Sequence, residues 1–342
     1  MARRRRRVVA TGPWTAPGWD AALLDAGCEL ICGPSIDDAP SSPVAERDLV
    51  KLCAGADAIL VSTRETITPA VFDAAPDLRI VAKATIGVER IDIRAATERG
   101  VLVVNSPAPE NIIGVAEATI GLIVALAKRL VEKEARIRSG GWRDASTDGS
   151  LLLGRTIGIV GLGRVGGSVA RRLSGWDATL LAADPYLDDS RFHELGVERR
   201  DLGSLLVESD VVTFHVPLTP ETRSFIGDAQ LASMRRGAYL VNTSRGPIID
   251  ERALVDALRS EHLGAAALDV FEHEPLSANS ELRSLPRERL LLTPHSIGSS
   301  LGSRGTGTRM AVAAILAALR GTVPDHVLNP AVISAWSARW AA

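Results

Sequence analysis

Three titratable side chains in the second half of the chain have the types and the placement to do chemistry at a carbonyl group. Arg245, Glu274 and His295 each follow a short apolar run that predicts a β-strand. Parallel strands end at a common edge of a sheet, where such sheets bind ligands, so we expect these side chains to open onto one site. An arginine fork can grip a carboxylate and a carbonyl oxygen, and a histidine can donate a proton to that oxygen.

Glu274 would support His295 in this set. A glutamate bonded to the second ring nitrogen fixes the histidine tautomer and favours the charged ring. Taken singly, Arg245 reads as a surface charge, Glu274 as a solvated acid and His295 as a structural histidine. Three such residues at strand ends beside a nucleotide motif favour the catalytic interpretation. His273 is a rival acid, but it lies between two glutamates and is predicted to be exposed.

The stretch from Arg155 to Asp184 has the order strand, glycine turn, helix, strand, acid, which is the dinucleotide-binding βαβ signature. Gly161 permits the tight turn, Gly163 lets the backbone approach a pyrophosphate, and Gly166 lets helix and strand pack closely. Asp184 can accept hydrogen bonds from ribose hydroxyls and would repel a 2′-phosphate. The stretch predicts NAD (NADH) rather than NADP, and together with the three titratable residues it predicts hydride transfer to a 2-keto acid.

Alternating apolar runs and helical patterns predict an α/β protein with two doubly wound parallel-sheet domains. We expect a Rossmann NAD domain at residues 109–299, with six strands, inserted in a flavodoxin-like substrate domain. The substrate domain would comprise residues 1–108 and the returning segment 300–342. One long helix, from about Asn111 to Ile137, is expected to cross between the domains.

The bulk composition is that of an ordinary globular protein. The chain has 342 residues, is 46% hydrophobic and carries a net charge of −2, so it gives no electrostatic case for a nucleic-acid or membrane partner. We interpret the run Arg3 to Arg7 as a solvated tail rather than a polyanion-binding arm. Three cysteines without zinc spacing predict reduced thiols, a cytoplasmic protein and no metal site. The apolar region Ile112 to Leu130 contains Glu117 and Lys128 and is interpreted as a buried helix.

With these motifs in view, the sequence resembles the D-isomer-specific 2-hydroxyacid dehydrogenases over nearly its whole length, and phosphoglycerate dehydrogenase most broadly. The resemblance implies that Arg245, Glu274 and His295 form the catalytic set, and that the protein is a homodimer formed through its cofactor domains. It rests on the glycine motif and on the segments Lys83 to Asp92, Asn111 to Glu117, His215 to Thr222, Asn242 to Asp250, Leu268 to Pro275 and Thr293 to His295.

The resemblance and the strand-end positions together give two sets of expected ligand contacts. His215 is expected to line the nicotinamide pocket rather than to take part in the chemistry. The loop amides of Ile86 and Gly87 are expected to bind a carboxylate, although their turn also fits a plain strand-to-helix connection. The expected substrate-binding residues are Lys83, Thr85, Ile86, Gly87, Arg245 and His295. The expected cofactor-binding residues are Gly161, Gly163, Arg164, Val165, Gly166, Asp184, His215, Val216, Pro217, Thr222, Thr243, Ser244, Arg245, Asp269, His295 and Gly298.

Two departures from the family pattern concern the substrate. Thr85 stands where family members usually carry a glycine. Glycines at 302, 305 and 307 interrupt the start of an expected helix, where each costs about 1 kcal/mol relative to alanine. We expect a loop there, flexible or closing over the substrate, whose Arg304 or Arg309 either meets a phosphate or stays solvated.

The sequence leaves the substrate open. The candidates are doubly anionic acids (3-phosphoglycerate or a phosphonopyruvate-like compound), favoured slightly by Lys83, and glyoxylate, hydroxypyruvate or longer 2-keto acids. Phosphite dehydrogenase shares the fold and is an alternative, whereas formate dehydrogenases lack the acid partner that Glu274 provides. A different class is an NAD-sensing, corepressor-like interaction protein of the same fold, with a peptide groove in residues 1–100 and negligible turnover.

Overall fold

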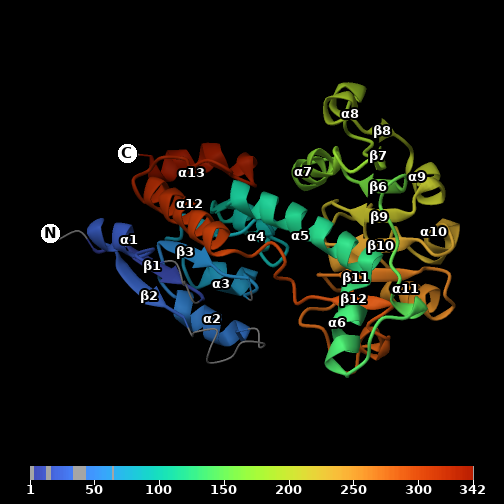
Figure 1. Ribbon diagram of the computed structural model, residues 1–342. Helices are drawn as coiled ribbons and strands as arrows, with labels where there is room; N and C mark the ends of the chain where they lie inside the picture. Colours follow the sequence, from blue (N-terminus) through green and yellow to red (C-terminus); the bar gives the residue numbers. More distant parts are fainter. Residues whose placement is uncertain (1–3, 13–16, 34–43, 64, 342) are drawn as a thin grey trace. The chain divides into compact units, whose positions relative to one another are not determined.

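The computed structural model describes residues 4–12, 17–33, 44–63 and 65–341, and the chain divides into two compact units. Unit 1 comprises residues 1–111 with 300–342, and unit 2 comprises residues 112–299. Each unit has a sheet whose named strands all pair in parallel, with helices on both faces (Figure 1). The predicted fold class is confirmed.

Unit 1 contains a five-stranded sheet with helices from both ends of the chain. Its elements are β1 (Arg7–Ala10), α1 (Ala21–Asp25), β2 (Glu29–Cys32), α2 (Glu46–Cys53), β3 (Ala58–Val61), α3 (Pro69–Asp73), β4 (Ile80–Lys83), α4 (Ile93–Glu98), β5 (Leu102–Val104), α12 (Leu301–Leu319), the 3₁₀ helix η4 (Pro330–Val332) and α13 (Ile333–Trp340). The order β2-β1-β3-β4-β5 is that of flavodoxin-like sheets.

The alternation of side chains along each strand decides which helices cover which face of the unit 1 sheet. Val9 and Ile59 pack with α2, α3 and α4, whereas Val8 and Leu60 pack with α1, α12 and α13. The returning C-terminal segment also contacts the sheet edge, because Leu328 N–H donates to the Val103 carbonyl at 2.8 Å. The returning segment therefore supplies α12 and α13, which with α1 form one helical layer of unit 1.

Three of the N-terminal arginines, Arg4, Arg6 and Arg7, are bound to the fold and do not form a solvated tail. Arg4 and Arg6 donate to the carboxylate of Asp57, a fully buried side chain, at 3.2 and 3.0 Å. Arg7 lies in β1, and its N–H donates to the same carboxylate at 2.8 Å. The tail interpretation was wrong for these residues, since a buried acid 50 positions away in the sequence needs cationic partners. Arg3 lies outside the described residues.

Unit 2 contains a seven-stranded sheet in the order β12-β11-β10-β9-β6-β7-β8. Its strands are β6 (Thr156–Val160), β7 (Thr179–Ala183), β8 (Glu198–Arg199), β9 (Val211–Phe214), β10 (Tyr239–Asn242), β11 (Ala265–Leu268) and β12 (Leu290–Leu292). Strands are added on one side of β6 up to β8 and on its other side from β9 onward. Rossmann sheets bind nucleotides at this change of side. The expected count of six strands was wrong because β8 has only two residues, both exposed, and carries no apolar pattern.

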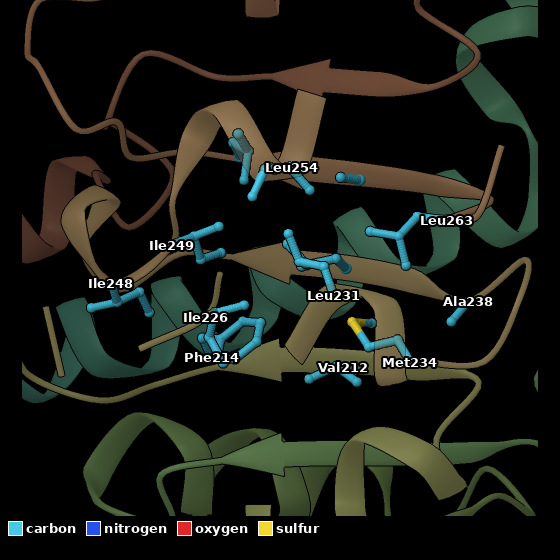
Figure 2. Close-up of a cluster of buried hydrophobic side chains, with 14 of the residues drawn as sticks. Val212, Phe214, Ile226, Leu231, Met234, Ala238, Ile248, Ile249, Leu254 and Leu263 are labelled. Carbon is cyan, nitrogen blue, oxygen red and sulfur yellow. The ribbon is translucent and has the colours of Figure 1, made fainter. Parts of the chain in front are cut away.

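Helices cover both faces of the unit 2 sheet. They are α5 (Pro109–Lys128), which begins in unit 1, α6 (Leu130–Arg138), α7 (Arg164–Leu173), α8 (Asp189–Leu195), α9 (Leu202–Glu208), α10 (Asp228–Ser233) and α11 (Glu251–Arg259), with 3₁₀ turns η1 (Ala145–Thr147), η2 (Gly246–Ile248) and η3 (Glu281–Ser284). On one face α5, α7 and α8 bury residues such as Ile123, Val169 and Phe192. On the other, α9, α10 and α11 pack around Phe214 of β9, and Leu254 of α11 lies in the same core, which Figure 2 shows.

The single helix expected from Asn111 to Ile137 is two helices. Arg129 separates α5 from α6 and adopts a left-handed backbone with φ 52°. Such a break is invisible to hydrophobic periodicity, because arginine is a good helix former. By length and hydropathy alone α5 could cross a membrane, but Ile120, Ile123 and four further apolar residues of it lie in a core cluster of unit 2.

The loop expected around the glycines 302, 305 and 307 is helical, since α12 begins at Leu301. Ser300 caps it in a reciprocal pair, with Ser303 N–H donating to Ser300 Oγ at 3.0 Å and Ser300 N–H donating to Ser303 Oγ at 2.9 Å. Gly307 is buried, and a Cβ there would lie 2.2 Å from the carbonyl oxygen of Ala84. Helix and strand end thus approach closely at Gly307, which explains one glycine that helix propensity alone disfavours.

The two ends of this glycine segment should respond oppositely to alanine. Gly302→Ala should stabilise unit 1 by up to about 1 kcal/mol, because a Cβ there meets only the Ser300 hydroxyl at 3.9 Å. Gly307→Ala should destabilise it by about 1–3 kcal/mol through overpacking on Ala84. Urea unfolding of both variants checks this. A flexible loop would instead give two small shifts of the same sign.

Candidate active site

The glycine turn after β6 is built by backbone approaches that exclude a side chain. Gly161 has φ +88°, and a Cβ on it would lie 2.7 Å from the His215 carbonyl oxygen. A Cβ on Gly166 would lie 2.0 Å from the Gly161 carbonyl oxygen. Gly163, the residue before α7, has no heavy atom within 4 Å of that position. Gly161 and Gly166 therefore serve packing, and the open Gly163 leaves the N–H groups of α7 accessible to an anion. Arg164 is exposed and Val165 half-buried beside it.

Asp184 is bound to the glycine turn from the neighbouring strand. Its carboxylate accepts from Leu162 N–H at 2.9 Å and from Tyr186 N–H at 3.1 Å. The acid therefore fixes the turn between Gly161 and Gly163 as well as standing at the end of β7. The remaining lone pairs of a half-buried carboxylate are suited to accept from ribose hydroxyls.

The loop after β9 is closed by the hydroxyl of Thr222. This hydroxyl donates to the Pro217 carbonyl at 2.7 Å and accepts from Thr219 N–H at 2.8 Å. His215 at the start of the loop is half-buried, with Nε2 3.1 Å from Thr213 Oγ1. Burial lowers the pKa of His215 to about 3, so the ring is neutral near pH 7. Val216 is half-buried and Pro217 exposed.

Arg245 follows β10 in a turn organised by a buried asparagine. The Asn242 amide nitrogen donates to the Arg245 carbonyl at 2.9 Å, and its oxygen accepts from Ser244 N–H at 3.0 Å and from the Ser244 hydroxyl at 2.9 Å. The Thr243 hydroxyl lies 2.8 Å from that of Thr119 on α5. Sequence reasoning placed Thr243, Ser244 and Arg245 at this edge but missed Asn242, whose only signal was its position at a strand end.

Glu274 and His295 are brought together from different loops. Glu274 Oε2 lies 2.7 Å from His295 Nδ1, and Glu274 Oε1 accepts from Phe271 N–H at 3.1 Å. The imidazole is 50% exposed, so its other nitrogen can meet a ligand. His273, the rival acid, is exposed, as predicted. The pair has the geometry of a proton donor whose ring orientation is fixed by a carboxylate.

Asp269 shapes the turn that carries His295. Its Oδ1 accepts from Thr293 Oγ1 at 2.7 Å and from Ser296 N–H at 3.1 Å, and its Oδ2 accepts from Ile297 N–H at 3.2 Å. His295 itself has φ 49°, a left-handed conformation that a non-glycine residue adopts at a cost. The buried carboxylate holds the turn in this form. Gly298 follows, buried, and a Cβ on Gly114 of α5 would lie 3.0 Å from its carbonyl oxygen.

Unit 1 by itself offers a loop suited to an anion, at residues 83–87. Lys83 is only 4% exposed, and its ammonium donates to the Ser62 carbonyl. The Thr85 carbonyl accepts from Ser106 N–H at 3.1 Å, and the Ile86 carbonyl accepts from the Asn105 side chain at 2.9 Å. Among the described residues, the N–H groups of Ile86 and Gly87 have no acceptor. The carbonyls are thus held by protein while the amide donors are left for a ligand.

Among the described residues, no group of three or more His, Cys, Asp or Glu side chains is arranged to hold a metal ion.

Comparison with known proteins relates this chain to a family of NAD-binding proteins. Residues 120–296 match the model of the D-isomer specific 2-hydroxyacid dehydrogenase NAD-binding domain. A glyoxylate reductase of Korarchaeum cryptofilum is 40% identical over 306 residues, which are 87% of this chain and 89% of that protein. A D-3-phosphoglycerate dehydrogenase of Mycobacterium leprae is 40% identical over 298 residues, 86% of this chain but 56% of that longer protein.

This chain belongs to the D-isomer specific 2-hydroxyacid dehydrogenase family. Solved structures agree with the assignment. The TT0316 protein of Thermus thermophilus superposes with a TM-score of 0.84 at 32% identity, over 94% of this chain and 99% of that one. The NAD-dependent formate dehydrogenase of Staphylococcus aureus, solved with NAD, gives a TM-score of 0.78 at 30% identity, over 91% and 94%. The chain is an NAD-dependent oxidoreductase, as its glycine motif predicted.

Asp184 should be needed for NAD binding both as a ribose acceptor and as an anchor of the glycine turn. Asp184→Ala should weaken NADH binding at least about tenfold, equal to about 1.4 kcal/mol, without creating NADPH binding. Titration of NADH fluorescence checks this. Asp188→Ala, an exposed acid without a capping bond just before α8, is the matched control and should bind NADH normally. Unchanged affinity in Asp184→Ala would refute the anchoring role.

Proposed function

We propose that this protein transfers a hydride between NADH and a 2-keto acid to give a D-2-hydroxy acid, with His295 as the acid and base. The observation that carries the proposal is the 2.7 Å bond between His295 Nδ1 and Glu274 Oε2, which leaves Nε2 to face the substrate. Arg245 follows the neighbouring strand of the same edge and supplies a guanidinium for an anionic substrate. These three residues cover binding, polarisation and proton transfer.

The chain's own contribution to the reaction is charge and proton control. Bound NADH supplies the hydride that reaches the carbonyl carbon. As negative charge develops on the carbonyl oxygen, Arg245 stabilises it and His295 Nε2 delivers the proton. His295 ends neutral, with Nδ1–H still donating to Glu274. In the oxidation direction the neutral ring takes the proton from the hydroxyl group.

The residues at the edge of the unit 2 sheet fit NAD. We propose that the glycine turn with Arg164 and Val165 binds the pyrophosphate at the start of α7, and that Asp184 binds the adenine ribose. The neutral His215 ring suits an apolar nicotinamide face. The remaining proposed contacts lie at the ends of β9, β10, β11 and β12, namely Val216, Pro217, Thr222, Thr243, Ser244, Asp269 and Gly298.

For the substrate we propose a short 2-keto acid bound through its carboxylate. The N–H groups of Ile86 and Gly87, which lack acceptors among the described residues, support a carboxylate site next to Thr85. A doubly anionic acid has less support from Lys83 than its sequence position suggested, because this side chain is buried against Ser62. Arg304, which is exposed in the first turn of α12, remains a candidate contact for the phosphate of such an acid. The similar glyoxylate reductases make glyoxylate the first compound to test.

A panel of keto acids with NADH, followed at the nicotinamide absorbance, tests the activity. Glyoxylate, hydroxypyruvate, phosphohydroxypyruvate and phosphonopyruvate should include a substrate. His295→Gln should lower kcat for it by about 10²–10⁴-fold, the usual worth of a general acid. Its matched control is His273→Gln, which changes the exposed histidine next to Glu274 and should leave kcat unchanged. Wild-type turnover in His295→Gln would refute the role.

The two directions of the reaction should show opposite pH trends while chemistry limits the rate. Reduction needs His295 protonated, so it should slow as pH rises, and oxidation needs it neutral, so it should slow as pH falls. His215 adds no step, since its pKa near 3 keeps it neutral throughout. If only phosphite is oxidised, or if nothing turns over while NADH binds, phosphite dehydrogenase or the corepressor-like function takes the place of this proposal.

We also propose a cytoplasmic homodimer formed through unit 2. An apolar surface on and after α6 supports it, with Ile137 52% and Trp142 72% exposed around a hollow that Lys133 and Arg136 also line. Large exposed apolar patches mark protein contacts. Cys28, Cys32 and Cys53 are free thiols, which suits a reducing compartment.

The dimer has a direct test. Light scattering after size exclusion should give twice the chain mass for the wild type and the monomer mass for Trp142→Asp. Val207→Asp, at a residue 54% exposed on α9, is the control and should stay dimeric. A monomeric wild type, or a dimeric Trp142→Asp, would exclude this surface as the interface.

A further inference from the structure

A pair of glutamates links the first residue of α11 to the loop that carries Glu274. Glu272 N–H donates to Glu251 Oε1 at 2.6 Å, and Glu251 N–H donates to Glu272 Oε1 at 3.1 Å. The bonds are reciprocal, so each backbone N–H is satisfied by the other residue's carboxylate. Both side chains are half-buried, and α11 begins at Glu251. We call these two bonds the Glu251–Glu272 clasp.

The clasp acts on a loop that touches the catalytic groups on two further sides. Phe271 N–H donates to Glu274 Oε1 at 3.1 Å, which orients the carboxylate that holds His295. On the other side the backbone of Phe271 lies against Gly246, where a Cβ would be 1.9 Å from the Phe271 carbonyl carbon. Gly246 directly follows Arg245. The short loop 271–274 therefore contacts both the Arg245 turn and the Glu274 carboxylate, and its position sets the distance between them.

The arrangement has a cost that packing alone does not explain. Burial raises the pKa of Glu251, and the negative charges of Glu272 and Glu274 add to this, whereas the bond from Glu272 N–H and the charge of His273 lower it. A non-polar residue at position 251 would avoid this repulsion but would leave the Glu272 N–H without its acceptor. The Glu272 carboxylate lies at the N-terminus of α11, where the helix N–H groups stabilise a negative charge.

We propose that Glu251 is a positioning residue for the Arg245–Glu274–His295 set, acting through the clasp. The proposal rests on the proposed function for its kinetic consequence, but its structural part stands without turnover. Through the clasp, α11 fixes the third side of loop 271–274, whose other two sides are Glu274 and Gly246. Neither Glu251 nor Glu272 was among the site residues expected from the sequence.

The kinetic test compares Glu251→Ala with Glu251→Gln. The alanine variant should lose about tenfold in kcat, because a small displacement of the reacting groups is costly, while KM for the keto acid and the NADH dissociation constant stay within twofold. Glutamine keeps an oxygen acceptor for Glu272 N–H and should restore most of kcat. An alanine variant with wild-type kcat, or a glutamine variant as impaired as alanine, would overturn the proposal.

A matched control separates positioning from a general loss of stability. Asp201→Ala removes an N-terminal cap of α9, which accepts from Ser204 N–H at 2.9 Å on the same face of unit 2. It should lower the unfolding temperature without lowering kcat. If Asp201→Ala and Glu251→Ala lose kcat in proportion to their unfolding temperatures, Glu251 has only a structural role and the proposal fails.

Hydrogen exchange of the whole protein with bound NADH gives a readout without turnover. In Glu251→Ala the amides of Glu272 and its neighbours in residues 269–276 should exchange faster than in the wild type, and in Asp201→Ala they should not. Unchanged exchange refutes the clasp whether or not a substrate is found. If instead the wild type reduces no keto acid while this exchange difference appears, the proposed reaction fails and the clasp stands.

Discussion

The carboxyl edge of the unit 2 sheet depends on polar side chains that accept hydrogen bonds from loop backbones. Asp184, Asn242 and Asp269 each stand at or just after a strand end and bind N–H groups of the glycine turn, the Arg245 turn and the His295 turn. A buried loop N–H without a partner would cost about 1–3 kcal/mol. These acceptors therefore decide the loop shapes, and the loop shapes decide where the side chains of Arg245 and His295 point.

The same constraint ties the polar side chains of this edge to the shape of its loops. Asp269 was expected to bind the cofactor, yet both of its oxygens accept from the turn around His295. Asp184 likewise serves the glycine turn. A substitution at either position is therefore expected to change the shape of a loop. His295 in its left-handed conformation is the group most dependent on such support.

The wrong expectations about the fold have one cause. The six-strand count, the single long helix and the glycine loop were all inferred from local pattern. β8 is held by pairing with β7, and Gly307 in α12 lies close to the Ala84 carbonyl. Neither contact can be inferred from a local sequence pattern. Arg129 breaks a helix that its own propensity favours. Tertiary contacts override local preference at β8 and at Gly307.

The sequence by itself determined the fold class, the cofactor and the family, because glycine spacing and strand–helix alternation are local and specific. It also placed Arg245, Glu274 and His295 at strand ends. Sequence reasoning also expected Glu274 to bond to His295, and the structure has this bond at 2.7 Å. Only the tertiary structure decided that Lys83 is buried and that Asn242 and the Glu251–Glu272 clasp organise the loops. The physical reason is that hydrogen bonds between distant segments depend on where loops cross in space, and residue type does not encode this.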